Sequence, residues 1–351
     1  MITETMILAS ALILTSPSGM GQKTDVLYFE NGDQLTCEIK SLSAGSLNVS
    51  VDYLDGTISV EWSKVVRLTS PQLFIIKTED GSAYSGKLST VDGGKDQPIE
   101  FQVDLASGGQ LRIAKSQIAE MSRTSDKFFG RLNGNISSGV IYSKGNDNTQ
   151  LSISTNIAYP RPHWGVGVSF NSNVSTSSGT ASSTRNQLAL DGYKLMRWKN
   201  FYYTGAASGL TSTEQGIDLQ TNLGAGIGRY IKNSNTVVFS FLAGATWQNT
   251  TYVPGATAGT TESIATGLLG VTLNIVHFSK TTLTFKASAL PTFNGDGRTF
   301  YNTNASYYLK LFGDLNWNLS FYGNWDTKPP QGYSGSDYGF SSGLGWTFGN
   351  W

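Results

Sequence analysis

The sequence has little charge, one cysteine and few histidines. Only 14% of the 351 residues are charged, and 25 basic residues balance 25 acidic ones. That share is about half of the usual one for soluble domains. A zero net charge predicts no polyanion-binding surface, so we expect no nucleic-acid partner. The single cysteine, Cys37, excludes an internal disulfide, and we interpret it as a small apolar strand residue.

Long apolar runs are also absent from the sequence. No stretch reaches about 18 consecutive apolar residues, so we expect no transmembrane helix. The one apolar run near the start, Met6 to Leu14, is followed by small residues up to Gly21. This pattern predicts a signal peptide over residues 1–21, although Glu4 stands where a basic residue is usual. A disordered tail is the alternative.

The residue types that catalysis and metal binding need are scarce. The two histidines, His163 and His277, fall at predicted turns, whereas a hydrolase needs such a base beside its nucleophile. No group of cysteine and histidine offers a zinc site, and the loop carboxylates Asp147, Asp218 and Asp296 lack a calcium-loop pattern. We therefore expect no catalytic, cofactor-binding or metal site, no cofactor, and a chain that is not an enzyme.

From about residue 128 onward, apolar and polar residues alternate one by one along the sequence. In the first such stretch, Leu132, Ile136 and Val140 point one way, and Asn133 and Asn135 point the other. Successive strand side chains face opposite sides, so this period of two gives one apolar and one polar face. About twelve such strands follow one another. Together with 40 glycines and 12% aromatics, the pattern predicts a wall with lipid on one side and water on the other.

The connections between these strands sort by length. Short turns are expected at residues 160–162, 197–200, 232–235, 277–280 and 312–314, and long loops at 173–184, 249–263 and 326–337. The sorting fails near residues 144–148 and 214–216, where the other end also has short connections. Bacterial outer-membrane barrels have short periplasmic turns and longer outer loops. The expected fold is therefore all-β, with a transmembrane antiparallel β-barrel of about twelve strands over residues 128–351, located in the bacterial cell outer membrane.

Aromatic side chains cluster near both predicted ends of the strands. Such girdles mark the two interfaces of a bilayer, so outer-membrane lipids are expected partners. The last strand is rich in aromatic residues, as in other outer-membrane barrels, and barrel-assembly machinery is therefore a second expected partner. The residues assigned to the interfaces are Tyr159, Trp164, Trp247, Trp325, Trp346 and Phe348.

Residues 24–124 form a separate region made of two similar units. Each unit has a strand, a tight turn and an alternating strand, with Asn31-Gly32 in the first turn and Asp80-Gly81 in the second. These dipeptides supply the positive φ angles that two-residue hairpins need. Duplicated units of about 50 residues predict tandem small β-barrels of the Sm-like or SH3-like kind. We expect a periplasmic domain with a structural role, or one that docks a protein partner or an envelope component.

Several short stretches resemble those of a known family. They are Gly130-Arg131-Leu132-Asn133-Gly134-Asn135, Lys144-Gly145-Asn146 with Asn148-Thr149, Gln215-Gly216-Ile217-Asp218, Gly224-Ala225-Gly226-Ile227-Gly228, Trp325-Asp326 with Pro329-Pro330, and Gly343-Leu344-Gly345. They are similar to the salt-induced outer-membrane proteins, which are catalogued as domain of unknown function 481. The resemblance covers about residues 129–351, and the tandem units also resemble those that often precede this barrel. It implies an outer-membrane barrel in a Gram-negative-type envelope, with no established activity.

The expected function depends on the bore of the barrel. Eight-stranded barrels are filled by side chains and sixteen-stranded ones leave a water channel, so about twelve strands lie between these cases. We favour a narrow pore or small-solute channel. The alternative is a structural or docking anchor whose periplasmic domain binds a partner, and an outer-membrane hydrolase is the least favoured hypothesis. The side chains expected to line the lumen are Tyr202, Lys286, Tyr308, Lys310 and Tyr322.

Overall fold

The computed structural model describes residues 23–54, 56–91, 98–143, 148–177, 182–196, 200–213, 215–253, 261–278, 280–293, 297–311, 315–328 and 335–346. Within these ranges the chain forms 22 strands and three 3-10 helices of three residues each, so the all-β prediction is confirmed. None of these helices is long and apolar enough to cross a membrane. The expected signal peptide over residues 1–21 lies outside the described residues.

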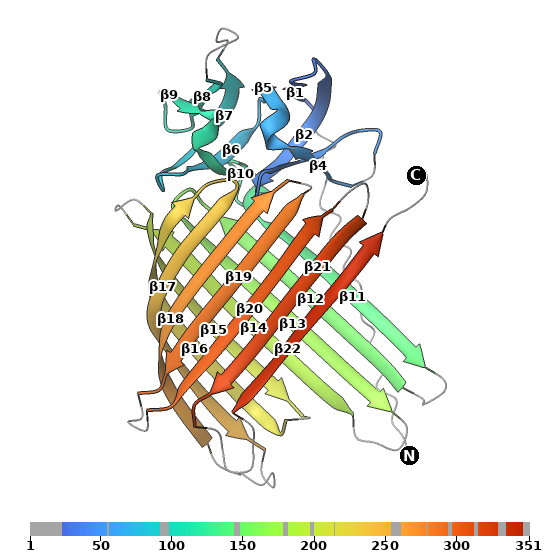
Figure 1. Ribbon diagram of the computed structural model, residues 1–351, viewed down its shortest axis with the longest axis vertical. Coiled ribbons are helices and arrows are strands. Elements are labelled where there is room, and N and C mark those ends of the chain that lie inside the picture. The colour runs from blue at the N-terminus through green and yellow to red at the C-terminus, as the bar shows by residue number, and fades with distance from the viewer. Residues whose placement is uncertain are drawn as a thin grey trace.

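The first ten strands build one small barrel. They are β1 (Asp25–Phe29), β2 (Gln34–Ser43), β3 (Ser46–Ser50), β4 (Ile58–Glu61), β5 (Val65–Thr69), β6 (Leu73–Thr78), β7 (Ala83–Thr90), β8 (Glu100–Leu105), β9 (Gln110–Ala114) and β10 (Ile118–Thr124). Six of them close a ring in the order β1, β5, β7, β6, β10, β2 and back to β1 (Figure 1). Two extensions leave the ring, β3–β4 from β2 and β8–β9 from β7.

The two sequence units are present, but they share this single ring. Strands β1–β5 and β6–β10 follow the same order, each with a 3-10 helix (Trp62–Lys64 or Lys115–Gln117) before its last strand. The units exchange edges, because β5 pairs with β7 at Thr69↔Ser89 and β10 pairs with β2 at Met121↔Leu42. The expected tandem pair is thus one barrel. A unit of about 50 residues buries a small share of its surface and is marginal on its own, so sharing one core stabilises both units.

One hydrophobic core joins both units. Leu27 from the first unit and Phe74 from the second are fully buried in the same cluster. Cys37 lies in this core on β2, as expected for a small apolar strand residue, and burial raises the pKa of its thiol to about 12. The hairpin glycines Gly32 and Gly81 have φ angles of 90° and 81°, which confirms the place of the two predicted turns. The expected two-residue type is wrong, because Asn31 and Asp80 do not have a positive φ and four residues separate the strands of each hairpin.

The remaining twelve strands form one antiparallel sheet in sequence order, which confirms the predicted number. They are β11 (Asn133–Ser143), β12 (Asn148–Pro160), β13 (Trp164–Ser177), β14 (Ser183–Leu195), β15 (Phe201–Ser212), β16 (Ile217–Asn233), β17 (Val237–Tyr252), β18 (Thr261–His277), β19 (Thr281–Pro291), β20 (Thr299–Lys310), β21 (Leu315–Asp326) and β22 (Ser336–Trp346).

This sheet is curved, but the described residues do not close it into a ring. No ladder joins β11 to β22, the two edges of the sheet (Figure 1). Every residue of β11 is exposed, as expected for a strand with a single neighbour. Alternation predicts that a strand exists and which way its side chains point. It does not encode which strand pairs with the first one.

The connections follow the predicted sorting in part, because three of those at the end opposite the short turns are also short, at residues 144–147, 178–182 and 213–216. The five short turns are at residues 161–163, 196–200, 234–236, 278–280 and 311–314. The long loop expected at 173–184 is wrong, because β13 continues to Ser177 and β14 begins at Ser183. That stretch is rich in Ser, Thr and Asn, so both faces of the strand are polar and its alternation is hidden. The longer connections, 253–260, 292–298 and 327–335, are all at the end opposite the short turns.

The two faces of the sheet differ in polarity. Leu190, Leu223 and Leu269 on one face are 48%, 45% and 58% exposed. On the other face, small polar side chains bond across strands, as Ser154 Oγ does to Asn171 Oδ1 at 2.8 Å. Soluble monomers rarely leave apolar patches of this extent uncovered. We call the two sides the apolar face and the polar face.

Candidate functional site

The small barrel sits on the short-turn end of the twelve-stranded sheet (Figure 1). Its β6–β7 hairpin makes the contacts: Glu79 Oε2 lies 3.1 Å from Lys232 Nζ, and Asn200 Nδ2 donates to the Glu79 carbonyl at 3.3 Å. A Cβ at Gly81 would collide with the backbone of Asn200, so glycine is required at this approach. We call this end of the sheet, around Asn200 and Lys232, the mouth.

Lys77 of β6 reaches into the mouth. Its Nζ lies 2.9 Å from Glu120 Oε2 of β10 and 5.2 Å from the centre of the Tyr193 ring of β14. Burial would lower the pKa of Lys77, but the charge of Glu120 and the hydrogen bond to it outweigh this effect, and the pKa is raised. The small barrel therefore places a cation that stays charged at neutral pH, paired with a carboxylate, against an aromatic ring of the sheet.

Tyrosines on the polar face lie over glycines of neighbouring strands. A Cβ at each of these glycines would collide with the tyrosine ring, and the three pairs are Tyr193 with Gly165, Tyr202 with Gly228 and Tyr322 with Gly339. A cross-strand aromatic fills the gap that a strand glycine leaves. Tyr202 also packs on Tyr230, with ring centres 4.8 Å apart. These rings consequently lie along the wall.

All five residues expected to line a lumen belong to the polar face. Tyr202 and Lys286 contribute to one cavity of about 230 Å³, together with Ser240 and Asn304. The other three, Tyr308, Lys310 and Tyr322, lie on β20 and β21 in the polar register of the ladder. Their assignment to a lumen stays a prediction, because the described strands do not close.

Sequence reasoning missed Lys77, Glu120, Tyr193 and Tyr230. The first two lie on the small barrel, and nothing in their local pattern indicates that they meet a second sheet. Tyr193 lies on the strand with the weakest alternation. Tyr193 and Tyr230 could have been found from the sequence. Both alternate with the apolar residues of their strands, which places them on the polar face, and both lie close to a predicted short turn.

The six interface aromatics occupy both ends of the sheet as far as they are described. At the short-turn end, Tyr159 packs on Trp164 with ring centres 5.8 Å apart, and its hydroxyl accepts from Arg131 Nη1 at 3.1 Å. Near the opposite end, Trp247 Nε1 donates to Ser263 Oγ at 2.8 Å, and Trp325 is the penultimate residue of β21. Trp346 ends β22, and Phe348 lies outside the described residues.

A comparison with protein families matches residues 136–348 to the family described as protein of unknown function, DUF481. The chain belongs to this family. The DUF481 match begins within β11 and extends past β22, so it covers the twelve-stranded sheet and leaves out the small barrel. The predicted membership in domain of unknown function 481 is confirmed, and the description of the family names no activity. No curated protein matches the sequence.

A cavity of about 520 Å³ lies between the small barrel and the DUF481 sheet. Trp62 and Lys115 line it on one side, and Thr236 of a short turn and His277 at the end of β18 line it on the other. The indole N–H of Trp62 is buried and has no acceptor among the described residues. Lys115 Nζ donates to the Ser63 carbonyl at 2.9 Å and lies 5.3 Å from the centre of the Trp62 ring. Burial lowers the pKa of Lys115 to about 8, against the opposing charge of Glu30.

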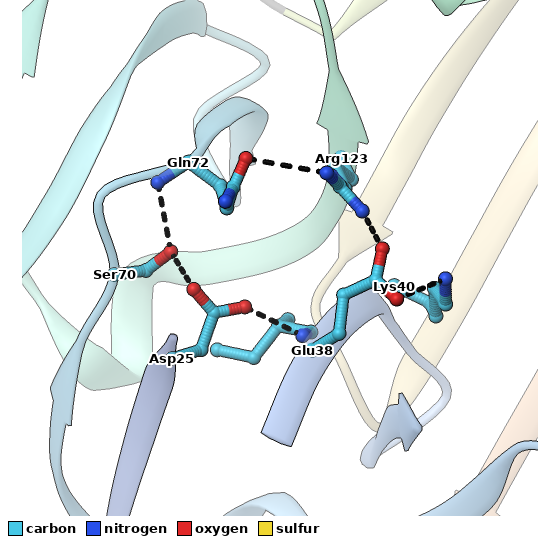
Figure 2. Close-up of polar contacts among 7 residues, drawn as sticks. Asp25, Glu38, Lys40, Ser70, Gln72 and Arg123 are labelled. Atoms are coloured by element: carbon cyan, nitrogen blue, oxygen red, sulfur yellow. Dashed lines mark hydrogen bonds and ion pairs between the residues drawn. The ribbon is translucent and has the colours of Figure 1, made fainter. Parts of the chain in front are cut away.

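A hydrogen-bond network that starts at a buried carboxylate of β1 reaches β10 of the second unit (Figure 2). Asp25 accepts hydrogen bonds from the Ile39 amide at 2.7 Å and from the Ser70 hydroxyl. Burial raises the pKa of Asp25, and these two hydrogen bonds oppose the rise. The network continues through Gln72 to Arg123 of β10, where Arg123 Nη2 donates to Gln72 Oε1 at 3.3 Å. Arg123 also pairs with Glu38, which Lys40 contacts at 2.6 Å.

Metal binding finds no support in the part of the chain that the structure describes. No three His, Cys, Asp or Glu side chains gather there into a group that could hold an ion. Of the three loop carboxylates considered from the sequence, Asp218 lies in β16, whereas Asp147 and Asp296 fall outside the described ranges.

Proposed function

We propose that this chain is a bacterial outer-membrane β-barrel in which β11 and β22 pair in the membrane and the small barrel lies in the periplasm. The proposal rests on one observation, the exposure of large apolar side chains on the face opposite the polar one. Covering that face with water costs roughly 25 cal/mol for each Å² of apolar surface. Acyl chains remove this cost, and a closed ring leaves no unpaired edge in lipid.

We further propose that the barrel is a narrow pore for small solutes, with its periplasmic mouth covered by the small barrel. Two features support a water-filled bore. The tyrosine rings lie against glycines of the neighbouring strands, so they pack along the wall. The polar face is lined by amides, hydroxyls and a few lysines, so ion selectivity is weak. Barrels of about twelve strands lie between filled and open ones, so the bore is narrow.

The test is conductance of the full chain in a planar bilayer. We expect a small, reproducible channel whose reversal potential in a salt gradient shifts toward cations when Lys286→Glu and Lys310→Glu are combined, because negative side chains then line the bore. Lys64→Glu, on the exposed surface of the small barrel, is the matched control and leaves the potential unchanged. A silent barrel, or an unchanged potential in the double variant, contradicts the pore.

A docking anchor is the second candidate, and the cavity beside Trp62 and Lys115 favours it. In this function the twelve-stranded barrel anchors the small barrel at the membrane, and the small barrel binds a periplasmic protein. A silent barrel whose small domain can be crosslinked to one defined protein in intact cells would support the anchor. Neither proposal assigns catalysis to the chain, and lipid hydrolysis by the detergent-solubilised protein would contradict both.

A further inference from the structure

The apolar face carries a groove that crosses five strands. The ladders align one row of outward residues, Arg229, Phe241, Val271, Ala287 and Thr303, beside a second row, Ile227, Ala243, Leu269, Ala289 and Tyr301. The side chains of Ala243, Ala287 and Ala289 are small. Those of Phe241, Leu269 and Tyr301 beside them are large, so the surface is hollow above the alanines. The hollow above the alanines has a volume of about 560 Å³.

One end of the groove carries an unpaired charge. Arg229 is exposed on the apolar face, and its guanidinium carbon lies 5.0 Å from the centre of the Phe201 ring. Among the described residues, no carboxylate and no hydrogen-bond acceptor contacts it. An arginine on the lipid side of a barrel is strongly unfavourable at mid-membrane and much less so near an interface. Such a charge therefore calls for an anion at the depth where it lies.

The depth of the groove follows from the strand register. Arg229 is four residues before the end of β16, and Thr303 is seven residues before the end of β20. With a rise of about 3.3 Å per residue and a tilt of about 40°, they lie about 10 Å and about 18 Å from the short-turn end. The 17 residues of β16 span about 43 Å on the same basis, against an apolar band of about 25 Å. Arg229 thus lies at the headgroup boundary, and the groove leads from it toward the membrane centre.

We propose that this groove binds one glycerophospholipid of the periplasmic leaflet, with its phosphate on Arg229 and an acyl chain over the alanines. The inference rests on the membrane placement proposed above. A planar guanidinium suits the oxygens of a phosphate, and its position at the boundary matches a headgroup. The wall of a second copy is convex and cannot enter a hollow of this shape, so the lipid is the better occupant.

The experiment measures binding of phosphatidylglycerol to the detergent-solubilised full chain by native mass spectrometry. Arg229→Gln removes the charge, and Ala289→Phe or Ala243→Leu fills the hollow. We expect each to weaken binding about tenfold, Arg229→Gln because one charge-assisted contact is lost and the alanine variants because the acyl chain no longer fits the hollow. Ala207→Phe places the same bulk on the apolar face outside the groove and leaves binding unchanged. Diacylglycerol, which lacks the phosphate, binds wild type about as weakly as phosphatidylglycerol binds Arg229→Gln.

Equal affinity in all variants, or equal weakening by Ala207→Phe, overturns the lipid site, because binding is then a general property of the wall. Insertion into phosphatidylglycerol vesicles separates this failure from that of the proposed function. A wild-type chain that inserts but shows no groove-dependent affinity contradicts only the lipid site. A chain that stays water-soluble and does not insert contradicts the membrane barrel itself.

Discussion

Glycine and tyrosine act together on the polar face of the sheet. Tyr202 occupies the space where a side chain of Gly228 would be. Its ring can lie along the wall because Gly228 has no side chain. The same relation holds for Tyr193 and Tyr322. The bulk of these rings therefore does not by itself tell whether the bore is blocked. Their position depends on the residue opposite.

Adding a methyl group at Gly228 should displace the Tyr202 ring from the wall. We expect Gly228→Ala to reduce conductance and to lower the stability of the barrel by about 1–3 kcal/mol, the usual range for overpacking. Gly343→Ala is the control, since a Cβ there meets no atom within 4 Å. Conductance and thermal unfolding in detergent measure both effects. Equal behaviour of the two variants would contradict the packing argument.

Lys115 predicts a pH dependence of the small barrel. Its pKa is about 8 in the folded chain and about 10.4 when unfolded. Below pH 8 the folded state must hold a charge that burial disfavours. Between pH 8 and pH 10 the folded state releases that proton while the unfolded state keeps it, so stability rises with pH. Urea unfolding of the small barrel should show this rise in wild type and lose it in Lys115→Met.

Lys64→Met serves as the control for that titration. A hydrogen bond to Glu30 raises the pKa of Lys64, so this lysine does not release its proton between pH 8 and pH 10. The rise in stability should persist in Lys64→Met. If Lys115→Met keeps the full rise, another group causes it.

Individual strands could be predicted from the sequence, whereas their partners could not always be. Alternation such as that of Leu132, Ile136 and Val140 follows from local geometry and indicates both a strand and its apolar face. The pairing of Met121 with Leu42 joins residues almost 80 positions apart, and no local pattern encodes it. The groove at Arg229 escaped prediction for the same reason, because its alanines come from two strands, β17 and β19, and Arg229 comes from a third, β16.

Closure of the ring is a testable property of the first and last strands. If β11 and β22 pair in the membrane, inward positions of the two strands come within the Cα separation of about 4.4–6.8 Å that a disulfide needs. We expect Ser137→Cys combined with Gly339→Cys, Ser341→Cys or Gly343→Cys to crosslink in at least one combination in native outer membranes. The crosslink is read as altered gel mobility before and after reduction.

The control for closure is Ser137→Cys with Ser306→Cys, since Ser306 lies on β20, away from both edges of the sheet. Native Cys37 can stay in place because it is fully buried. If none of the three cysteine pairs between β11 and β22 forms a crosslink, the sheet stays open or another chain lies between its edges.

At the scale of the whole molecule, the small barrel and the sheet meet through few polar contacts. The Glu79–Lys232 pair is partly exposed, and exposed pairs contribute about 0.2–1 kcal/mol. If the small barrel covers the mouth, Glu79→Lys should raise the open fraction of the channel several-fold through charge repulsion. Adding Lys232→Glu should restore the wild-type value, and single-channel recording measures both. No rescue in the double variant would mean that this pair does not control the cover.

The exchange of edges in the small barrel has a consequence for its synthesis. Strands β2 and β5 each lack a neighbour until the chain beyond residue 70 is available to supply β7 and β10. The first half therefore emerges with two open borders that any extended segment could join. The ring closes only when β10 has been synthesised, so the small barrel cannot complete its fold until just before the twelve-stranded sheet begins.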